Sequence, residues 1–309
     1  MDRTTAFETV GLTEKNGDLT AEQITKVKGI GCLRDKRFPD VFNVRVITRN
    51  GKITTGEVKS IAEAADLYGS GEVAMTSRQT IEIQGVPYDN IPLLVLFLKE
   101  RGLETGGTGA KVRPVVSCKG TTCVFGLVDT YSLSLKIHEE FYVKCHDVAL
   151  PHKFKIAVGG CPNNCVKPDL NDIGVIGQRV AAPDVDLCRG CKKCVIESSC
   201  PMKAAKVIDG KITFDKTICN NCGRCFTKCP FGVMNEAKSG YKICIGGRWG
   251  KKGERGRALE AVFESEEAVL LTIGKAMNLF RDEGIKGERF AETIERLGFD
   301  YVQKKILEK

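Results

Sequence analysis

The chain has 309 residues, of which 42% are hydrophobic and 28% are charged. These proportions are typical of a globular protein that buries a sizeable core and divides into more than one unit. The net charge of +8 is compatible with nucleic acid, an acidic protein, an anionic substrate or a carboxylate-rich cofactor, and does not choose among them. No apolar run approaches the roughly 18 to 20 residues of a membrane span, and the first residues lack the layout of a signal peptide. We therefore expect a cytoplasmic protein without a membrane span.

The chain contains 15 cysteines. Because the cytoplasmic thiol pool keeps cysteines reduced, we do not expect a disulfide framework. Metal ligation is the expected use of most of them.

The first 105 residues predict alternating strands and helices. Residues 41–47 alternate apolar and polar side chains, as a half-buried strand does, and Arg45 lies on the polar side. Apolar residues recur at helical spacing from residue 56 onward, with Val58, Ile61, Ala62 and Ala65 on one face. Residues 73–86 predict one further strand, and residues 90–101 a further helix. The result is a βαβα unit.

A glycine-rich linker at residues 106–109 precedes a second region. Its predicted elements are strands over 112–116, 153–158 and 241–245, and helices over 127–142, 258–282 and 288–307. In the strand at 153–158, Lys153 and Lys155 lie on the face opposite Phe154. Because ordinary globular sequence flanks the cysteine-dense residues 184–235, we expect that segment to be an insertion.

Eight cysteines form two closely spaced runs inside this insertion. The runs are Cys188, Cys191, Cys194 and Cys200, then Cys219, Cys222, Cys225 and Cys229. The second has the C-x2-C-x2-C-x3-C-P spacing of bacterial ferredoxins, and the first has two extra residues before its last cysteine. The fourth cysteine of each run ligates the other cluster in such proteins. This pattern assigns Cys188, Cys191, Cys194 and Cys229 to one 4Fe-4S cluster, and Cys219, Cys222, Cys225 and Cys200 to a second.

Structural zinc is the alternative for these eight cysteines. Zinc sites usually take cysteines as separated pairs, whereas here a third cysteine follows each pair after two residues. The spacing therefore favours iron–sulfur clusters.

Four more cysteines stand outside the insertion, at Cys118, Cys123, Cys161 and Cys165. The sequence Gly160-Cys-Pro-Asn-Asn-Cys165, after a predicted strand, resembles the second cysteine pair of the sirohaem sulfite and nitrite reductases. The resemblance implies that all four hold a 4Fe-4S cluster coupled to sirohaem, and that Cys165 also bridges to the haem iron. The first pair has four intervening residues where the assimilatory enzymes have five. Buried core thiols are the alternative for Cys118 and Cys123.

Residues 45–55, 76–80 and 150–155 resemble the same family in the same order. The resemblance implies that Arg45, Arg113, Lys153 and Lys155 are the catalytic cations, and that Arg78, Gln79, Thr80, Asn163, Gly247 and Arg248 contact the cofactor. Fixed cations stabilise the charge that develops on sulfite oxygens, and a guanidinium can bind two oxygens at once. A lysine near other cations can have a lowered pKa, which suits proton transfer. A solvated surface charge is the alternative for any one of them.

The resemblance implies an α+β fold in three parts. Residues 1–105 would form the ferredoxin-like half-domain of sulfite and nitrite reductases, residues 106–182 and 236–309 the sirohaem and 4Fe-4S domain, and residues 183–235 an inserted two-cluster ferredoxin domain. The single half-domain and the insertion resemble most the catalytic chain of the anaerobic sulfite reductases.

The implied function is the six-electron reduction of sulfite to sulfide at sirohaem. Electrons would come through the ferredoxin domain from a flavin or iron–sulfur donor subunit, and the chain would pair with itself or with a paralogous chain. Nitrite reduction and electron transfer without substrate turnover are the alternatives. The basic loop at residues 246–257 could contact nucleic acid. The family context assigns it instead to the sirohaem carboxylates, and we expect no nucleic-acid partner.

Overall fold

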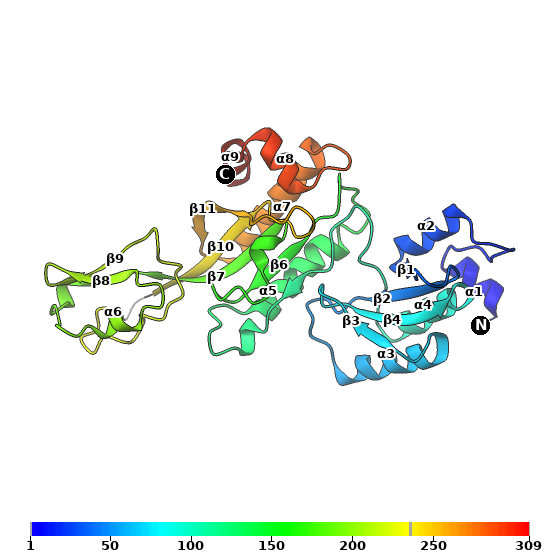
Figure 1. The fold of residues 1–309 in the computed structure, drawn as a ribbon, viewed down its shortest axis with the longest axis horizontal. Helices are drawn as coiled ribbons and strands as arrows, with labels where there is room; N and C mark the ends of the chain where they lie inside the picture. Colours follow the sequence, from blue (N-terminus) through cyan, green and yellow to red (C-terminus); the bar gives the residue numbers. More distant parts are fainter. Residues whose placement is uncertain (1, 235–236, 309) are drawn as a thin grey trace. The chain divides into compact units, whose positions relative to one another are not determined.

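The computed structural model describes residues 2–234 and 237–308 (Figure 1). The chain divides into two compact units. Unit 1 comprises Met1–Val116, Ser134–Lys155 and Phe280–Phe290, and unit 2 comprises Ser117–Leu133, Ile156–Leu279 and Ala291–Lys309. The predicted domain boundary between residues 235 and 236, like the two terminal residues 1 and 309, lies outside the described residues.

Unit 1 contains a four-stranded antiparallel sheet in the order β1-β2-β4-β3. The strands are β1 (Cys32–Arg34), β2 (Val41–Val46), β3 (Val73–Met75) and β4 (Ile81–Pro87). The helices are α1 (Arg3–Thr9), α2 (Ala21–Gly29), α3 (Thr55–Tyr68) and α4 (Ile91–Glu100), with the 3-10 turn η1 (Tyr88–Asn90) before α4. The predicted strand at 41–47 is confirmed as β2, along which buried and half-buried residues alternate.

Two features of unit 1 differ from the sequence prediction. Residues 73–86 form a hairpin of β3 and β4 rather than one strand, because the chain turns at residues 76–80, where Gln79 has a left-handed backbone (φ 59°). On α3 the buried residues are Ile61, Ala64 and Ala65, whereas Val58 and Ala62 are exposed. The helix begins with a reciprocal capping box between Thr54 and Glu57, which satisfies two backbone N–H groups.

The core of unit 1 lies between the sheet and its helices. Fully buried Phe42 and Val44 of β2 and Leu94 and Leu98 of α4 belong to one hydrophobic cluster. Helix α3 packs against both α4 and β4. This core holds β2 and β4 in a fixed register, with Arg45 directly opposite Glu82.

The helix predicted over 127–142 changes its character along its length. It begins as α5 (Thr130–Ile137) and continues as a π-helical segment, η3 (His138–Val143). Insertions of this kind are rare and occur frequently at functional sites. The segment buries His138, Phe141 and Tyr142.

Unit 2 is built on a five-stranded sheet in the order β11-β10-β7-β6-β5. The strands are β5 (Val116–Ser117), β6 (Ile156–Gly159), β7 (Ile173–Ala181), β10 (Ala237–Ile245) and β11 (Arg257–Phe263). Strands β6 and β7 are parallel, and β10 is antiparallel to both β7 and β11. Three helices follow in the chain, α7 (Glu266–Glu283), α8 (Phe290–Leu297) and α9 (Phe299–Leu307).

The C-terminal prediction is wrong at two points. Residues 257–263 form β11 rather than the start of a helix, because pairing with β10 overrides their helical preference. The helix predicted over 288–307 is divided into α8 and α9 at Gly298, whose φ of 88° favours glycine. The predicted strands at 112–116 and 153–158 are shorter and begin later than predicted: β5 shares only Val116 with the first, and β6 begins at Ile156 and ends at Gly159.

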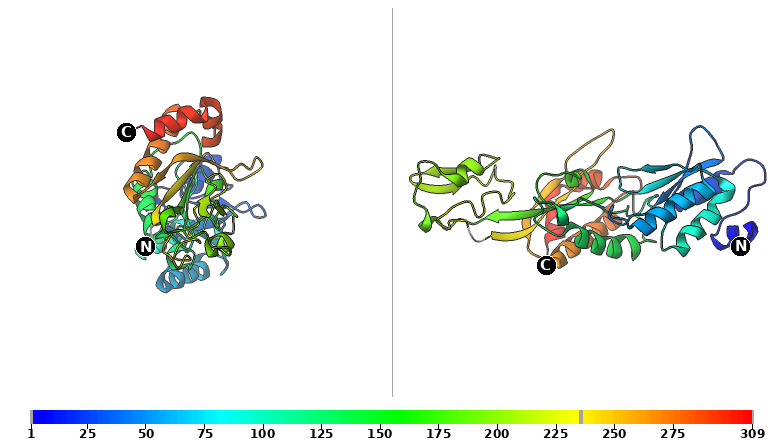
Figure 2. Two further views of the ribbon diagram at one scale, coloured as in Figure 1. Left: turned by 90° about the vertical axis from the view of Figure 1, so that its left-hand side faces the viewer. Right: turned by 90° about the horizontal axis from the view of Figure 1, so that it is seen from below.

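Strands β7 and β10 lead into the cysteine-rich segment, which contains η5 (Val185–Leu187), α6 (Val195–Ser199), β8 (Ala205–Ile208) and β9 (Lys211–Phe214) (Figures 1 and 2). Strands β8 and β9 form a separate antiparallel pair. A small core that includes Ile196, Ile212, Phe226 and Met234 lies within this segment.

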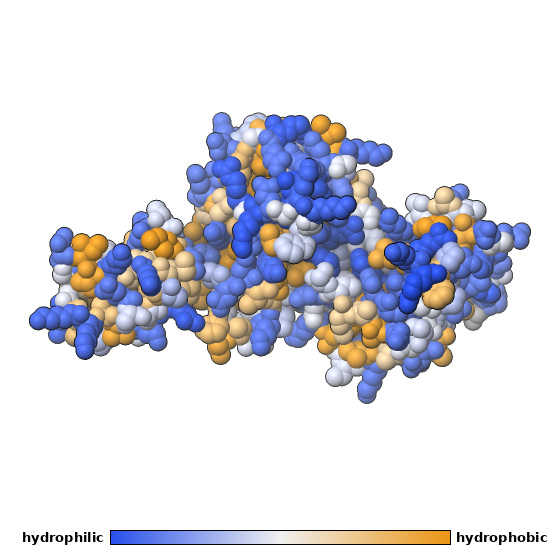
Figure 3. All heavy atoms as spheres, viewed as in Figure 1, coloured by the Kyte–Doolittle hydropathy of each residue, from blue (hydrophilic) through white to orange (hydrophobic). Residues whose placement is uncertain are grey.

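The face shown in Figure 3 is mainly hydrophilic, with separate hydrophobic patches. Across the residues that the structure describes, no helix is both long and apolar enough to span a lipid bilayer.

Candidate functional site

Five basic side chains of unit 1 line a single cavity of about 150 Å³. They are Arg45, Arg78, Arg113, Lys153 and Lys155, and the cavity wall also includes Gly107 and Pro114. These residues come from β2, from the β3–β4 turn, from the stretch before β5 and from the stretch before β6. The structure therefore brings together all four predicted catalytic cations and one predicted cofactor contact.

Arg45 is fixed on the face of β2 opposite the core. Its Nη2 lies 2.7 Å from Glu82 Oε1, and its Nε donates to the same oxygen at 3.2 Å. Both side chains are 16% exposed. The remaining terminal nitrogen, Nη1, donates to the carbonyl oxygen of Gly107 at 3.3 Å. These contacts hold the guanidinium at the cavity wall.

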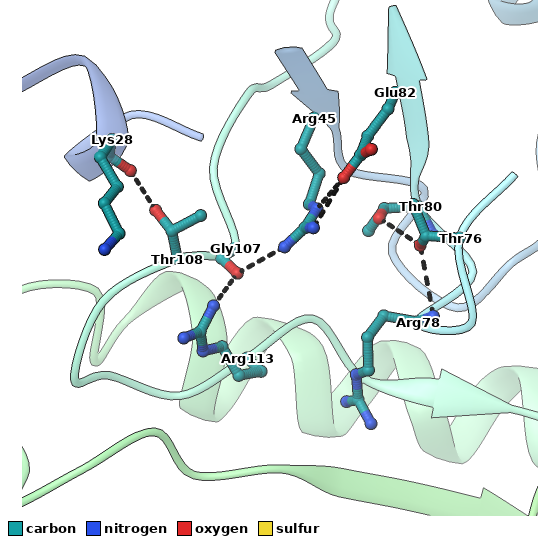
Figure 4. A network of polar contacts seen from close by, with 9 residues as sticks. All are labelled: Lys28, Arg45, Thr76, Arg78, Thr80, Glu82, Gly107, Thr108 and Arg113. Carbon is teal, nitrogen blue, oxygen red and sulfur yellow. Dashed lines mark hydrogen bonds and ion pairs between the residues drawn. The ribbon is translucent and has the colours of Figure 1, made fainter. Parts of the chain in front are cut away.

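Arg113 approaches the same carbonyl from another element. Its Nη1 donates to the oxygen of Gly107 (Figure 4). Burial lowers the pKa of Arg113 to about 10, and the nearby charge of Arg45 acts in the same direction. A cation kept in such surroundings favours the binding of an anion, since a negative charge offsets both effects.

Arg78 reaches the cavity from the β3–β4 turn, and its Nη2 donates to the carbonyl oxygen of Pro114. The turn is held by a 2.7 Å hydrogen bond between the hydroxyls of Thr76 and Thr80, and Thr80 is 1% exposed. The carbonyl of Gln79 accepts from Thr48. Gln79 and Thr80 thus shape the turn that presents Arg78.

Lys153 and Lys155 flank the fully buried Phe154. The ring of Phe154 packs against Phe280 at 5.7 Å and Phe290 at 5.5 Å between centroids. The backbone N–H of Arg113 donates to the carbonyl of Phe154 at 2.8 Å. Because alternate side chains of an extended chain point to opposite faces, the buried ring turns both lysines toward the cavity.

In unit 2, the four cysteines outside the insertion lie in two loops that pack closely together. The backbone N–H of Gly160 donates to Cys118 Sγ at 3.1 Å, and Cys118 N–H donates to the carbonyl of Val158 at 3.0 Å. Burial raises the pKa of Cys161, and the fields of Cys118, Cys165 and Cys123 act in the same direction. All four sulfurs therefore contribute to one local environment.

In the insertion, five of the eight cysteines pack against the small core: Cys188, Cys194, Cys200, Cys225 and Cys229. Burial raises the pKa of Cys225 to about 11, and Cys219, Cys222 and Cys200 add to this shift. These are the same four thiols that the spacing assigns to one cluster. Within residues 2–234 and 237–308, no group of three His, Cys, Asp or Glu side chains is arranged to hold a metal ion.

A second cavity, of about 720 Å³, lies within unit 2. Its wall includes Cys161 and Asn163 from the loop after β6. It also includes Arg179 from β7, and Cys222 and Phe226 from the cysteine-rich segment. The N–H of Arg179 donates to the carbonyl of Asn221 at 2.8 Å. The cavity therefore has one cysteine from each of two predicted cluster sites in its wall.

Gly247 and Arg248, two further predicted cofactor contacts, belong to unit 2 and make local contacts there. Arg248 is paired with Glu254, Glu292 and Glu295 at 2.9 to 3.5 Å, and its side chain is 13% exposed. Gly247 packs against the backbone of Asp169, where a Cβ would lie 2.2 Å from the carbonyl oxygen. Packing against this carbonyl therefore requires glycine at position 247.

Sequence reasoning missed three groups that hold the cations in place: the Glu82 carboxylate, the Gly107 carbonyl and the Tyr142 hydroxyl. Tyr142 accepts a 3.1 Å hydrogen bond from Gly107 N–H. Only the Glu82 contact could have been inferred from the sequence, because antiparallel pairing of β2 with β4 places Glu82 opposite Arg45.

Two family models match the chain. Residues 34–101 match the nitrite/sulfite reductase ferredoxin-like half domain, and residues 108–309 match the nitrite and sulphite reductase 4Fe-4S domain. Together the matches take in the five cations of the cavity and every predicted cysteine ligand.

Similar proteins are known by sequence and by structure. The chain is 30% identical over 287 residues to coenzyme F420-dependent sulfite reductase of Methanocaldococcus jannaschii, covering 91% of this chain but 44% of that protein. It is 24% identical over 325 residues to the alpha subunit of the dissimilatory-type sulfite reductase of Nitratidesulfovibrio vulgaris, covering 91% and 72%. One of the anaerobic sulfite reductase subunits of Salmonella typhimurium is 27% identical over 253 residues, covering 75% and 72%. A crystal structure of dissimilatory sulfite reductase I has a TM-score of 0.70 at 23% identity, over 87% of this chain and 69% of that one.

Proposed function

This chain belongs to the nitrite and sulfite reductase family, and from that premise we propose that it is the catalytic chain of a sirohaem-dependent sulfite reductase. The reaction would be the six-electron reduction of sulfite to sulfide. Because the chain spans less than half of the F420-dependent relative, its electron donor and its partners are part of the proposal.

The observation that carries this proposal is the cavity with five cations in its wall. Like charges gathered in one cavity repel one another, and Glu82 offsets this only at Arg45; a bound anion offsets it further, and sulfite is a small oxyanion of suitable charge. The Nε atom of Arg113 is a further indication that an anion binds in this cavity. It is buried and has no hydrogen-bond partner among the described residues, so it is a donor available to a ligand.

The donor chemistry of the residues suits the cofactors that the family implies, and the hydrogen bond from Gly160 N–H to Cys118 Sγ brings the two cysteine loops together. Cys118, Cys123, Cys161 and Cys165 would hold one 4Fe-4S cluster, with Cys165 the residue that would serve both the cluster and the sirohaem, and thiolates are the usual ligands of such clusters. Arg78, with Gln79 and Thr80, would hold a sirohaem carboxylate. When bound, the sirohaem and its cluster supply electrons to the sulfur atom of the substrate.

The side chains of the cavity have separate tasks in this proposal. Arg113 and Arg45 bind the oxyanion, since a guanidinium stays charged and offers paired donors. Lys153 and Lys155 donate to the oxygens that leave as water and relay protons to them. Their attachment on both sides of buried Phe154 keeps the two ammonium groups on the same side of the chain.

Electrons would arrive through the cysteine-rich segment. Its two predicted 4Fe-4S clusters would make it an inserted ferredoxin domain and bring the total to three clusters. The cavity that Cys161 and Cys222 share supports transfer between the cluster of Cys219, Cys222, Cys225 and Cys200 and the sirohaem-coupled one. A flavin or iron–sulfur subunit would reduce the segment, and the chain would act in the cytoplasm, paired with itself or a paralogue.

Nitrite is the second candidate substrate, because the matched family includes nitrite reductases and nitrite is also reduced by six electrons. The anaerobically purified protein should therefore be given each anion with a chemical electron donor, while sulfide and ammonia are measured. An optical spectrum with iron analysis must accompany the assay. Sulfide formation faster than ammonia formation at equal anion concentration supports the proposal. A haem-replete protein that forms neither product overturns it.

A further inference from the structure

Tyr142, Gly107 and the two arginines form one chain of contacts behind the cationic cavity. Gly107 N–H donates to the Tyr142 hydroxyl at 3.1 Å, and the carbonyl of Gly107 accepts from both Arg45 and Arg113. Figure 4 shows the two guanidinium groups meeting at this carbonyl. A single residue therefore connects the buried phenol to both cations.

The backbone at this point can be occupied only by glycine. Gly107 has a φ of 74°, and a Cβ there would lie 2.8 Å from the ring of Pro114. A Cβ at Gly106 would lie 2.7 Å from the Tyr142 hydroxyl oxygen. The two glycines thus allow the chain to pass between the phenol and the cavity.

Tyr142 itself is rigidly held. It is 5% exposed and lies in the π-helical segment, where its ring stacks on His138 at 4.7 Å between centroids. Because the Tyr142 hydroxyl is fixed, the Gly107 N–H that donates to it is held in one direction. This restricts the direction in which the Gly107 carbonyl can point. Two like charges that share one acceptor would separate if that acceptor could move.

We propose that Tyr142 is a positioning residue for anion binding, which acts through Gly107 to keep Arg45 and Arg113 converged on the cavity. The inference rests on the proposed function, because the anion is taken to be sulfite. Tyr142 does not line the cavity, so its effect must pass through the backbone of Gly107.

The test uses the holoenzyme and compares an anionic ligand with a neutral one. Sulfite and carbon monoxide are titrated separately against the haem spectrum of wild type and of Tyr142→Phe. Loss of one buried hydrogen-bond acceptor should weaken sulfite binding about tenfold, equivalent to about 1.4 kcal/mol, and leave carbon monoxide binding unchanged. The KM for sulfite should rise more than kcat falls.

Tyr88→Phe is the matched control. Tyr88 is 1% exposed, and its hydroxyl donates to the carbonyl of Thr13 at 2.8 Å; neither residue lines the cationic cavity. This variant loses the same group from an equally buried place, so it should be less stable but bind sulfite normally. Equal weakening of sulfite binding in both variants would show a general structural effect and overturn the inference.

Two further measurements keep the proposal falsifiable if Tyr142→Phe folds poorly. Thr108→Val removes the hydroxyl that anchors the same loop to the carbonyl of Lys28, and should weaken sulfite binding selectively as well. In the double variant Tyr142→Phe/Arg113→Ala, the loss should be smaller than the sum of the two single losses, because part of the Tyr142 effect acts through Arg113. Additive losses, or unchanged sulfite binding in Thr108→Val, would overturn the proposal. A haem-replete wild type that binds no sulfite would instead overturn the proposed function.

Discussion

Arg45 and Glu82 lie directly opposite each other on β2 and β4, and their ion pair places a carboxylate beside a cavity whose charged lining residues are all cations. The pair is well shielded, since both side chains are 16% exposed. Glu82 therefore orients Arg45 and also reduces the positive potential that an incoming anion meets.

Replacing Glu82 by Gln separates these two effects. The free energy of unfolding should fall by roughly 1 to 3 kcal/mol, because Arg45 is left without its counter-charge in a shielded place. Sulfite should bind a few-fold more tightly and with a steeper dependence on salt. Urea unfolding and ligand titration measure the two quantities.

Glu63→Gln is the control for that variant, because Glu63 forms an exposed pair with Arg101 at 3.9 Å. It should change stability by less than about 0.5 kcal/mol. Equal effects of the two substitutions would contradict a special role for the Arg45 pair.

Arg113 and Lys155 should fail in different ways when substituted. Arg113→Ala should mainly raise the KM for sulfite, because it removes binding that is common to the ground and transition states. Lys155→Met should lower kcat by a factor of roughly 10² to 10⁴ if this lysine delivers protons. Each variant must retain its full haem and iron content, and the surface substitution Lys144→Met serves as control. Normal turnover by both cavity variants would place the active site elsewhere.

Acid should destabilise unit 1 through His138. Burial lowers the pKa of this residue from 6.5 to about 4. Between these values the unfolded chain binds a proton at His138 and the folded chain does not, so the free energy of unfolding decreases as the pH falls through this window. The full effect is roughly 3 kcal/mol. Urea midpoints of wild type and His138→Gln at pH 7 and pH 5 should show a smaller pH dependence in the variant, whereas exposed His146→Gln should behave like wild type.

Metal content tests the cysteine assignments. Protein purified without oxygen should contain about twelve cluster irons and one haem iron, from four irons in each cluster. Cys225→Ser should remove about four irons and leave the haem spectrum unchanged, whereas Cys165→Ser should disturb both the haem spectrum and a cluster. Cys145→Ser, outside every predicted set, should change neither. Zinc in place of iron in the insertion would refute the ferredoxin assignment.

Local sequence patterns predicted the strands and helices whose formation depends on residues close together in the sequence. The alternation along β2 and the apolar spacing of α4 follow from burial on one face, and both elements occur as predicted. The β3–β4 turn escaped notice because its left-handed residue is Gln79 rather than glycine. Strand β11 escaped because its preference for strand comes from pairing with β10.

The cationic residues of the site were predictable, but the contacts that organise them were not. Each cation stands at a position that strand periodicity or family resemblance can identify. Arg45 and Arg113 both donate to the carbonyl of Gly107, which stands 62 residues after Arg45 and 6 residues before Arg113. Their meeting depends on the path that the backbone takes between them. No periodic pattern records such a path.

The antiparallel pairing of β7 with β10 begins at Ala181 and Ala237, so the cysteine-rich segment leaves and re-enters the sheet at neighbouring positions. Its two ends thus coincide with the tip of a hairpin. A module attached in this way can be gained, lost or exchanged during evolution without altering the strand order of the sheet, because a short turn can join the same two residues. The proposed electron-supply route can therefore diversify while the cationic cavity of unit 1, the proposed substrate site, stays the same.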